Sequence, residues 1–139
     1  MSSQPDPNEK TLIVVKPDAV ARGLVGEILG RFEKRGMKIL QLRAQTMTKA
    51  KAEEFYIVHK ERPFFRELVG FFTSGITVGA VIQGRDAVAT VRRMVGATKS
   101  WESAPGTIRG DLATGLTDNA IHASDSKESF ERESKAYFS

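Results

Sequence analysis

The feature that most constrains the fold is the run TLIVV at residues 11–15, which is followed at once by Lys16-Pro17-Asp18. The run is apolar or β-branched throughout and lacks the polar–apolar alternation of a strand with one side in water. It therefore predicts a buried central strand. Proline fixes its own φ and has no N–H to donate, so the chain is expected to turn directly after Val15. This turn leaves Lys16 at the end of the central strand.

Apolar periodicity predicts the other elements. Helices are expected over residues 20–32, after a Thr48 cap to about His59, over 64–72, over 87–95 after an Asp86 cap, and from 126 to about Arg132. Strands are expected over residues 37–47 and 76–83, with a short edge strand at Tyr137-Phe138. Residues 97–121 show no period, and a long irregular segment in a compact domain is usually functional or disordered. Because it leads directly into His122, we expect it to be functional.

The resulting order is strand, helix, strand, two helices, strand, helix, long loop, helix, strand. In a chain of 139 residues this order favours an α/β (α+β) ferredoxin-like βαββαβ sandwich, an antiparallel four-stranded sheet covered by helices, which we expect on one face. A doubly wound sheet needs more parallel βα units. The polar, proline-rich start predicts a disordered N-terminal tip over residues 1–9 and one domain over residues 10–139.

Composition narrows the class of protein. Hydrophobic residues make up 40% and charged residues 27% of the chain, as in soluble globular proteins. The absence of cysteine excludes disulfides, a thiolate nucleophile and a cysteine-based zinc site. The start does not resemble a secretory signal and no apolar run reaches membrane-spanning length, so we expect a cytoplasmic protein. A net charge of +4 suits an anionic ligand such as a nucleotide.

One short segment carries the clearest candidate for chemistry. Asn119-Ala120-Ile121-His122-Ala123-Ser124-Asp125-Ser126 contains one of the two histidines in the chain, flanked by small residues. A neutral imidazole is a usable nucleophile or base near neutral pH. The same segment is also typical of a surface histidine that precedes a helix N-cap. On its own it leaves both interpretations open.

The common phosphate-binding loops are absent: the sequence contains no Gly-Lys pair, no GxGxxG, and no His-Arg-Asp or Asp-Phe-Gly. Phosphates would therefore be bound by single side chains, for which Lys16, Arg92, Thr98 and Arg109 are candidates. Each has a structural alternative. Arg92 can complement a helix C-terminus, Arg109 can pair with Asp111, and Lys16 can be an exposed strand end.

Several blocks together resemble nucleoside diphosphate kinases. The segment from Asn119 to Asp125 is similar to the N-x-x-H-G-S-D signature of that family. Family-like blocks also occur, in the family's order, at residues 13–18 with 22–28, 55–56 with 60–65, and 105–111. The resemblance extends from about Lys10 to Phe138. Departures are Ala123 where glycine is usual, Leu116 for a smaller aliphatic, and Ile76 and Ser100 where proline is frequent.

The resemblance implies an enzyme that transfers the γ-phosphate of a nucleoside triphosphate to a nucleoside diphosphate. The mechanism would be ping-pong, through a phosphohistidine at His122. Magnesium would be bound through the nucleotide phosphates, with no metal ligand in the protein. The implied nucleotide-binding residues are Lys16, Phe64, Arg92, Thr98, Arg109 and Asn119. The implied supporting residues are Tyr56, Leu116, Ser124, Glu133 and His59.

The implied roles differ along the site. Glu133 would orient the imidazole, and Tyr56 and Ser124 would support it. Phe64 and Leu116 would contact the two faces of the base, although Phe64 can also be ordinary core. His59 would reach a phosphate. The resemblance further implies a homo-oligomer, a tetramer or hexamer built from dimers, whose contacts the ending at Ser139 would weaken.

Two other functions compete with this interpretation. A nucleic-acid-binding module on a ferredoxin-like sheet would suit the basic charge and the phenylalanines, but the RNP1 pattern is absent and the arginines are dispersed. A catalytically inactive nucleotide-binding relative is disfavoured because every expected chemical position is filled. Substitution of His122 separates these functions.

Overall fold

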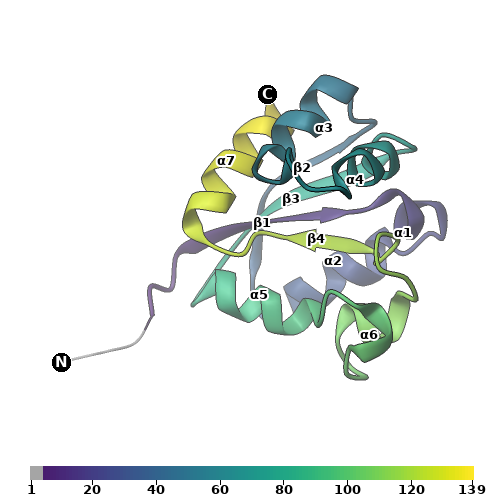
Figure 1. The fold of residues 1–139 in the computed structure, drawn as a ribbon. Coiled ribbons are helices and arrows are strands. Elements are labelled where there is room, and N and C mark those ends of the chain that lie inside the picture. The colour runs from purple at the N-terminus through teal and green to yellow at the C-terminus, as the bar shows by residue number, and fades with distance from the viewer. Residues whose placement is uncertain (1–4) are drawn as a thin grey trace.

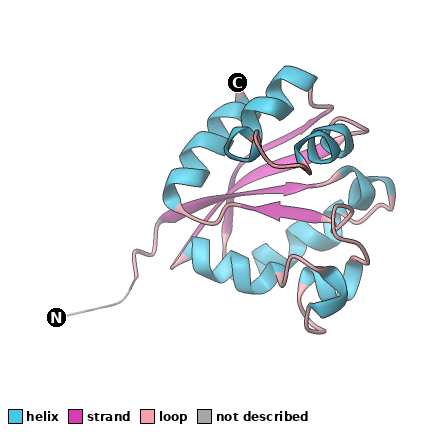
Figure 2. Ribbon diagram, in the orientation of Figure 1, coloured by secondary structure: helices cyan, strands magenta, loops and turns pink. Residues whose placement is uncertain are grey.

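A computed structural model of the chain describes residues 5–139. Its centre is a sheet of four antiparallel strands, β1 (Glu9–Val15), β2 (Lys38–Gln45), β3 (Thr77–Gly84) and β4 (Ile121–Ala123). Their order across the sheet is β2-β3-β1-β4 (Figures 1 and 2). This is the predicted ferredoxin-like arrangement.

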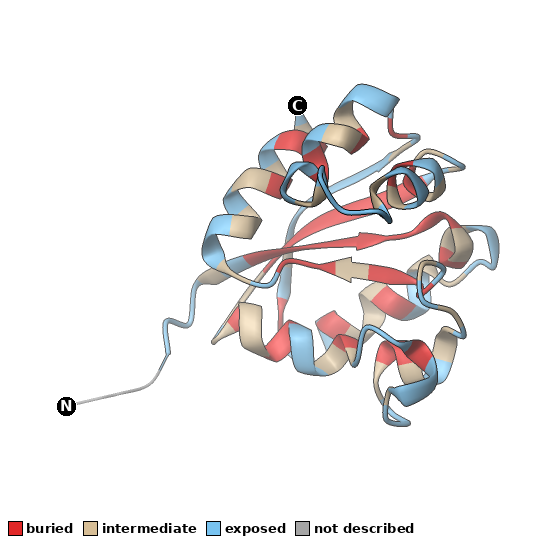
Figure 3. Cartoon of the chain, viewed as in Figure 1, coloured by how far each residue is buried: buried red, intermediate tan, exposed pale blue. Residues whose placement is uncertain are grey.

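The central position of β1 explains its sequence. It pairs with β3 from Glu9 to Val15 and with β4 over its last three residues, so it has a neighbour on each side. Residues 12–15 are fully buried, as Figure 3 shows in red. The strand predicted from TLIVV is confirmed. The β1–β4 register places His122 opposite Val14.

Helices cover both faces of the sheet. On one face lie α1 (Pro17–Ala21), α2 (Val25–Lys34) and α5 (Ala87–Val95); on the other lie α3 (Lys49–Phe55), α4 (Phe65–Phe72) and α7 (Lys127–Phe138) (Figure 1). Ile13 and Val15 enter the first core, and Leu12 and Val14 enter the second. The expectation of helices on one face was wrong, because a strand that is apolar on both sides needs cover on both sides.

The C-terminal prediction was also wrong. Tyr137 and Phe138 form the last turn of α7 instead of an edge strand. The Tyr137 hydroxyl donates to the Arg43 carbonyl at 3.0 Å, and the ring packs over Gly79, where a Cβ would collide with it. The fourth strand is β4, which is three residues long and lies at the end of the segment that lacked periodicity.

Three helix predictions need correction. The helix expected to run to about His59 ends at Phe55, the last residue of α3. The helix expected over residues 20–32 is divided into α1 and α2 by a turn in which Gly23 has φ +74°. Asp86 precedes α5, but its side chain makes no capping hydrogen bond; instead the Glu9 carboxylate accepts from the Val88 N–H at 2.9 Å. The Thr48 cap of α3 is confirmed, since its hydroxyl accepts from the Lys51 N–H at 3.2 Å.

The remaining elements are short. The 3₁₀ turn η1 (Ile57–His59) follows α3, and η2 (Ser100–Glu102) and α6 (Ile108–Leu112) interrupt the long segment before β4. Part of the tip predicted over residues 1–9 lies outside the described residues. β1 already begins at Glu9, and the Pro5 carbonyl accepts from Arg85 at 2.9 Å. Within residues 5–139, no helix is long and apolar enough to cross a membrane.

Candidate active site

A cleft of about 490 Å³ gathers residues that are far apart in the sequence. All predicted site residues except Ser124 line it. The Ser124 hydroxyl donates a hydrogen bond to Glu133, which does line the cleft. The lining also includes residues that sequence reasoning had not assigned to the site, namely Val58, Glu67, Leu68, Thr117, Ala123, Asp125, Ser129 and Arg132. The cleft is therefore the place where the sequence candidates meet.

His122 enters the cleft from the middle of β4. Ile121 and Ala123 point into the core beneath α5, so alternation along the strand turns His122 to the opposite face. The imidazole packs edge-on against Phe55, with ring centroids 4.9 Å apart. Its Nε2 lies 2.7 Å from Glu133 Oε1. An ionised carboxylate only accepts hydrogen bonds, so Nε2 carries the proton and Nδ1 keeps a free lone pair.

Glu133 is a buried carboxylate on α7. Its Oε1 also accepts from the Ser124 hydroxyl at 2.7 Å, and Arg132 lies 3.5 Å from Oε2. Burial raises the pKa of Glu133, but the neighbouring His122 and these hydrogen bonds lower it by more, so the net pKa lies below its usual range. The carboxylate thus stays ionised beside the imidazole.

Lys16 is buried at the end of β1 instead of being an exposed strand end. Its Nζ donates to Asn119 Oδ1 at 2.9 Å and to the Thr117 carbonyl at 3.4 Å. Burial, together with the charge of Arg109, lowers the pKa of Lys16 to about 8. An ammonium group held with so little solvation is a strong site for an anionic oxygen.

Arg109, from α6, is likewise buried. Its guanidinium donates to the carbonyls of Asn119, Gly96 and Ile121 at 3.3, 3.4 and 2.7 Å. Burial and the nearby Arg92 lower its pKa to about 10. The alternative pairing with Asp111 does not occur, because Asp111 pairs with Arg31 at 2.9 Å. Arg109 holds the chain around β4 and also lines the cleft.

Arg92 and Thr98 line the cleft together with Lys16 and Arg109. Arg92, in the last turn of α5, donates to the Ala123 carbonyl at 3.1 Å and is otherwise exposed. The carbonyl of Thr98 accepts from Asn119 Nδ2 at 3.2 Å, which fixes the amide that contacts Lys16. Because Arg92 lies in the last turn of α5, it can also complement the C-terminus of that helix, as the structural interpretation predicted.

The approach to His122 contains a strained residue. Ala120 is fully buried and has φ +72°, a conformation that costs a side-chain-bearing residue about 1–2 kcal/mol. Its N–H donates to Asp18 Oδ2 at 3.0 Å, and its carbonyl accepts from the Lys16 N–H at 2.8 Å. Asp18 is a supporting residue that the sequence analysis missed, since only the fold brings it next to Ala120.

The other end of the cleft is apolar and open. Phe64, immediately before α4, and Leu116, in the loop before β4, remain 43% and 51% exposed. Phe64 is thus not ordinary core. The His59 ring lies 5.6 Å from the Phe64 ring. The Tyr56 ring lies 6.4 Å from the His59 ring and 6.3 Å from the His122 imidazole, and burial and Glu133 raise the pKa of its hydroxyl.

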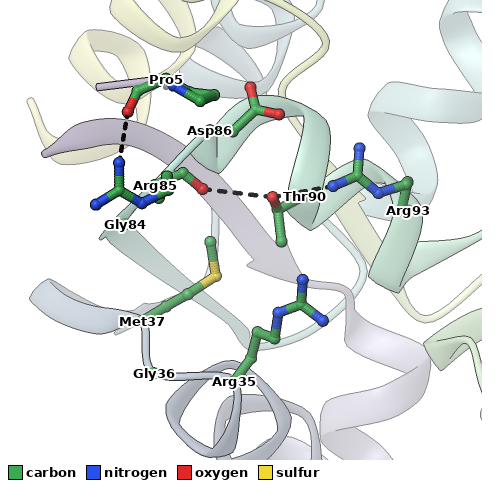
Figure 4. A pocket seen from close by; sticks show the side chains of 9 residues that line it. All are labelled: Pro5, Arg35, Gly36, Met37, Gly84, Arg85, Asp86, Thr90 and Arg93. Atoms are coloured by element: carbon green, nitrogen blue, oxygen red, sulfur yellow. Dashed lines mark hydrogen bonds between the residues drawn. The ribbon is translucent and has the colours of Figure 1, made fainter. Parts of the chain in front are cut away.

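A second recess of about 370 Å³ lies elsewhere, between the end of α2, the end of β3 and α5 (Figure 4). Arg35, Arg85 and Arg93 line it together with one carboxylate, Asp86. It holds no histidine or other nucleophile with a base beside it. The chemistry is concentrated in the first cleft.

The first cleft combines an oriented imidazole, an ionised carboxylate behind it, and buried cations around it. This arrangement suits phosphoryl transfer, which depends on positioning and charge stabilisation. Among residues 5–139 no group of three metal-ligating side chains is present. The fold and the cleft thus fit a ferredoxin-like phosphotransferase.

Comparison with known proteins identifies the family. The family model "Nucleoside diphosphate kinase" matches residues 9–139. A nucleoside diphosphate kinase of Hyperthermus butylicus is 51% identical over 133 residues, 96% of this chain and 94% of its own length. The kinase of Synechococcus sp. (strain CC9902) is 55% identical over 130 residues, 94% of this chain and 86% of its own.

Solved structures are similar as well. The nucleoside diphosphate kinase of Aquifex aeolicus superposes with a TM-score of 0.91 at 49% identity and covers 94% of this chain and 95% of its own. The Halobacterium salinarum enzyme, solved in complex with CDP, has a TM-score of 0.91 at 42% identity and covers 94% and 88%. The chain belongs to the nucleoside diphosphate kinase family. Members of this family transfer phosphoryl groups between nucleotides.

Proposed function

We propose that this chain transfers the γ-phosphate of a nucleoside triphosphate to a nucleoside diphosphate, with His122 as the intermediate carrier. The observation that carries this proposal is the 2.7 Å contact between His122 Nε2 and Glu133 Oε1 inside the cation-lined cleft. The contact leaves Nδ1 as the free nucleophile and needs no separate general base.

In the first half of the cycle, the Nδ1 lone pair attacks the γ-phosphorus. A P–N bond forms as the bond to the β–γ bridging oxygen breaks, and the diphosphate departs with that electron pair. The phosphorylated imidazole carries positive charge, which the Glu133 carboxylate stabilises. In the second half, a terminal oxygen of another nucleoside diphosphate attacks the same phosphorus and restores neutral His122.

The cationic side chains would bind the phosphates throughout this cycle. Arg92 and Arg109 would contact the outer oxygens with directed N–H donors, and the Thr98 hydroxyl would add another. Lys16 and Asn119, already 2.9 Å apart, would hold the sugar hydroxyls and the phosphate region. Because they are fixed by other contacts before substrate arrives, they need little reorganisation during the reaction.

The donor set fits magnesium that arrives with the nucleotide. Asp125 lines the cleft, and the hydrogen bond from Ser129 lowers its pKa, so it is an ionised carboxylate near the phosphate end. Mg²⁺ usually keeps several waters and binds substrate phosphates, so it would be held through the nucleotide, with the Asp125 charge nearby and no protein ligand required. When bound, the ion would neutralise charge on the β- and γ-oxygens.

The exposed pair Phe64 and Leu116 would contact the base. Contact with the faces of the base tolerates different bases, so we propose broad nucleotide use. The similar halophilic enzyme solved with CDP supports a nucleotide as ligand of this cleft. A cytoplasmic location belongs to the same proposal, since nucleoside triphosphates are made and used there.

We also propose a homo-oligomer built from dimers, a tetramer or a hexamer. β2 is an edge strand whose Leu40 and Leu42 are 44% and 56% exposed. An edge that is both unpaired and apolar favours pairing with another chain. Light scattering of the purified protein measures the mass of the assembly, and a monomer at micromolar concentration would contradict this part of the proposal.

Labelling tests the central proposal. The protein is mixed with γ-³²P-ATP and magnesium, freed of nucleotide, and assayed for label that acid releases and base spares; GDP is then added. We expect label on the protein and its transfer to GTP. His122→Asn should abolish labelling, whereas His59→Asn, at the other histidine, should still be labelled at His122. A folded protein that takes no label would disprove the mechanism and favour the inactive nucleotide-binding alternative.

A further inference from the structure

We infer that the hydrogen bond between Thr117 and Glu67 holds the two walls of the base-binding end of the cleft at a fixed separation, and that Thr117 is a positioning residue for the nucleotide. This cross-cleft hydrogen bond runs from the Thr117 hydroxyl to Glu67 Oε1 at 3.0 Å. Both residues line the cleft. The inference rests on the proposed function, since it concerns the same nucleotide.

Each partner of this hydrogen bond is next to one of the exposed apolar side chains. Glu67 lies in the first turn of α4, three residues after Phe64, which immediately precedes the helix. Thr117 directly follows Leu116. The cross-cleft hydrogen bond therefore joins the wall that carries Phe64 to the wall that carries Leu116.

Thr117 is also tied to the phosphate-binding end of the cleft. Its carbonyl accepts from Lys16 Nζ at 3.4 Å, while its hydroxyl reaches α4. Residues 114–118 belong to no helix or strand. Among the described residues, the hydrogen bonds of this segment are the two that Thr117 makes. Without its hydroxyl, Thr117 would keep only the hydrogen bond to Lys16.

This arrangement has a specific energetic consequence. A loop already held in its binding conformation pays less ordering entropy when ligand binds. Loss of the hydroxyl should therefore weaken nucleotide binding without changing the chemical step, which takes place at His122. Because contact with the faces of the base tolerates base identity, affinity should fall by a similar factor for all four common diphosphates.

The first experiment compares Thr117→Val, which keeps the shape and removes the donor, with Thr117→Ser, which keeps the hydroxyl. Binding of ADP, GDP, CDP and UDP to unphosphorylated protein is measured by titration calorimetry. We expect Thr117→Val to bind each diphosphate about three- to tenfold more weakly, the effect of losing one solvent-exposed hydrogen bond. Thr117→Ser should bind more tightly than Thr117→Val. Thr46→Val is the matched control, because Thr46 is exposed and outside the cleft.

The second experiment removes the other partner. Glu67→Ala should weaken binding by a factor close to that of Thr117→Val, and the double variant should be no weaker than either single variant. Labelled phosphoprotein is then discharged by increasing ADP. The half-saturating concentration should rise in Thr117→Val, and the rate at saturating ADP should match wild type.

Four results would overturn the inference. They are unchanged affinity in Thr117→Val, tighter binding in that variant, equal affinities of the Val and Ser variants, and additive effects in the double variant. Tighter binding would mean that the hydrogen bond closes the cleft instead of preparing it. Failure of the proposed function is distinguishable, because it appears as absence of phosphoprotein in wild type, whereas the calorimetric comparison needs no phosphoryl transfer.

Discussion

His122 Nε2 and Glu133 Oε1 lie 2.7 Å apart, and the same oxygen accepts the Ser124 hydroxyl at 2.7 Å. His122 belongs to β4, and Glu133 belongs to α7, the helix that follows this strand. The carboxylate fixes both the tautomer and the direction of the imidazole. A short strand and the helix that follows it thus determine which ring nitrogen keeps a free lone pair.

Glu133→Gln tests this relationship. The amide is close to the carboxylate in size but carries no charge and can present an N–H to the imidazole, so it no longer enforces a proton on Nε2. We expect the maximal rate of His122 phosphorylation to fall by about 100-fold. Rapid-quench measurement with labelled ATP gives the rate. Ser124→Ala, which removes one donor to Glu133 and leaves its charge, should cost less; equal losses in the two variants would contradict the assigned roles.

Lys16→Met separates binding from stability. The folded protein holds the Lys16 ammonium with a pKa of about 8, below the ordinary 10.5. Below pH 8 the buried charge costs about 3 kcal/mol, a cost that disappears between pH 8 and 10.5 as folded Lys16 loses its proton. The substitution removes this cost and should raise the free energy of unfolding at pH 7. The gain should be about 1–3 kcal/mol, because the loss of the donor to Asn119 offsets part of it.

The stability advantage of Lys16→Met over wild type should then shrink as pH rises from 8 to 10.5, and nucleotide affinity should be lost at every pH. Urea unfolding across this range, in parallel with titration by ADP, provides both readouts. A variant less stable than wild type at pH 7 would show that the hydrogen bonds of Lys16 outweigh the cost of burying its charge.

Arg92 and Arg109 should respond differently to truncation, although both line the cleft. Arg109→Ala removes a buried side chain that donates to three carbonyls, so it should lower the free energy of unfolding by about 2–4 kcal/mol as well as weaken nucleotide binding. Arg92→Ala removes an exposed side chain with one such contact and should change stability by less than about 1 kcal/mol. Thermal unfolding of the two variants without nucleotide checks the contrast, and equal destabilisation would contradict it.

The sequence predicted the parts of the fold that depend on local pattern. The run at residues 11–15 indicated a buried central strand because its burial requires every side chain to be apolar or β-branched. The chemical candidates were visible because His122, Arg109 and Lys16 are residue types with few substitutes. What local pattern could not reveal was the environment: the burial of Lys16, and the contact of Asp18 with Ala120, arise from segments about a hundred residues apart.

The wrong predictions have physical reasons too. β4 is three residues long, which is too short for an alternation to be recognised. α7 extends past the expected end near Arg132 to Phe138, although adjacent aromatic residues at 137 and 138 favour a strand by propensity. In the structure the tertiary contacts of Tyr137 override that propensity.

Gly79→Ala tests the contact that decides this C-terminal turn. A Cβ on Gly79 would overlap the ring of Tyr137, which is fully buried and held by its hydroxyl to Arg43 and Thr77. The ring cannot move without breaking these hydrogen bonds, so we expect a loss of about 2–4 kcal/mol in the free energy of unfolding. Chemical denaturation measures it, with Gly70→Ala as the control, since that position is open. Pairing Gly79→Ala with Tyr137→Leu should cost less than the sum of the two single changes, because the smaller side chain removes the overlap. Strict additivity, or a neutral Gly79→Ala, would show that α7 does not depend on this contact.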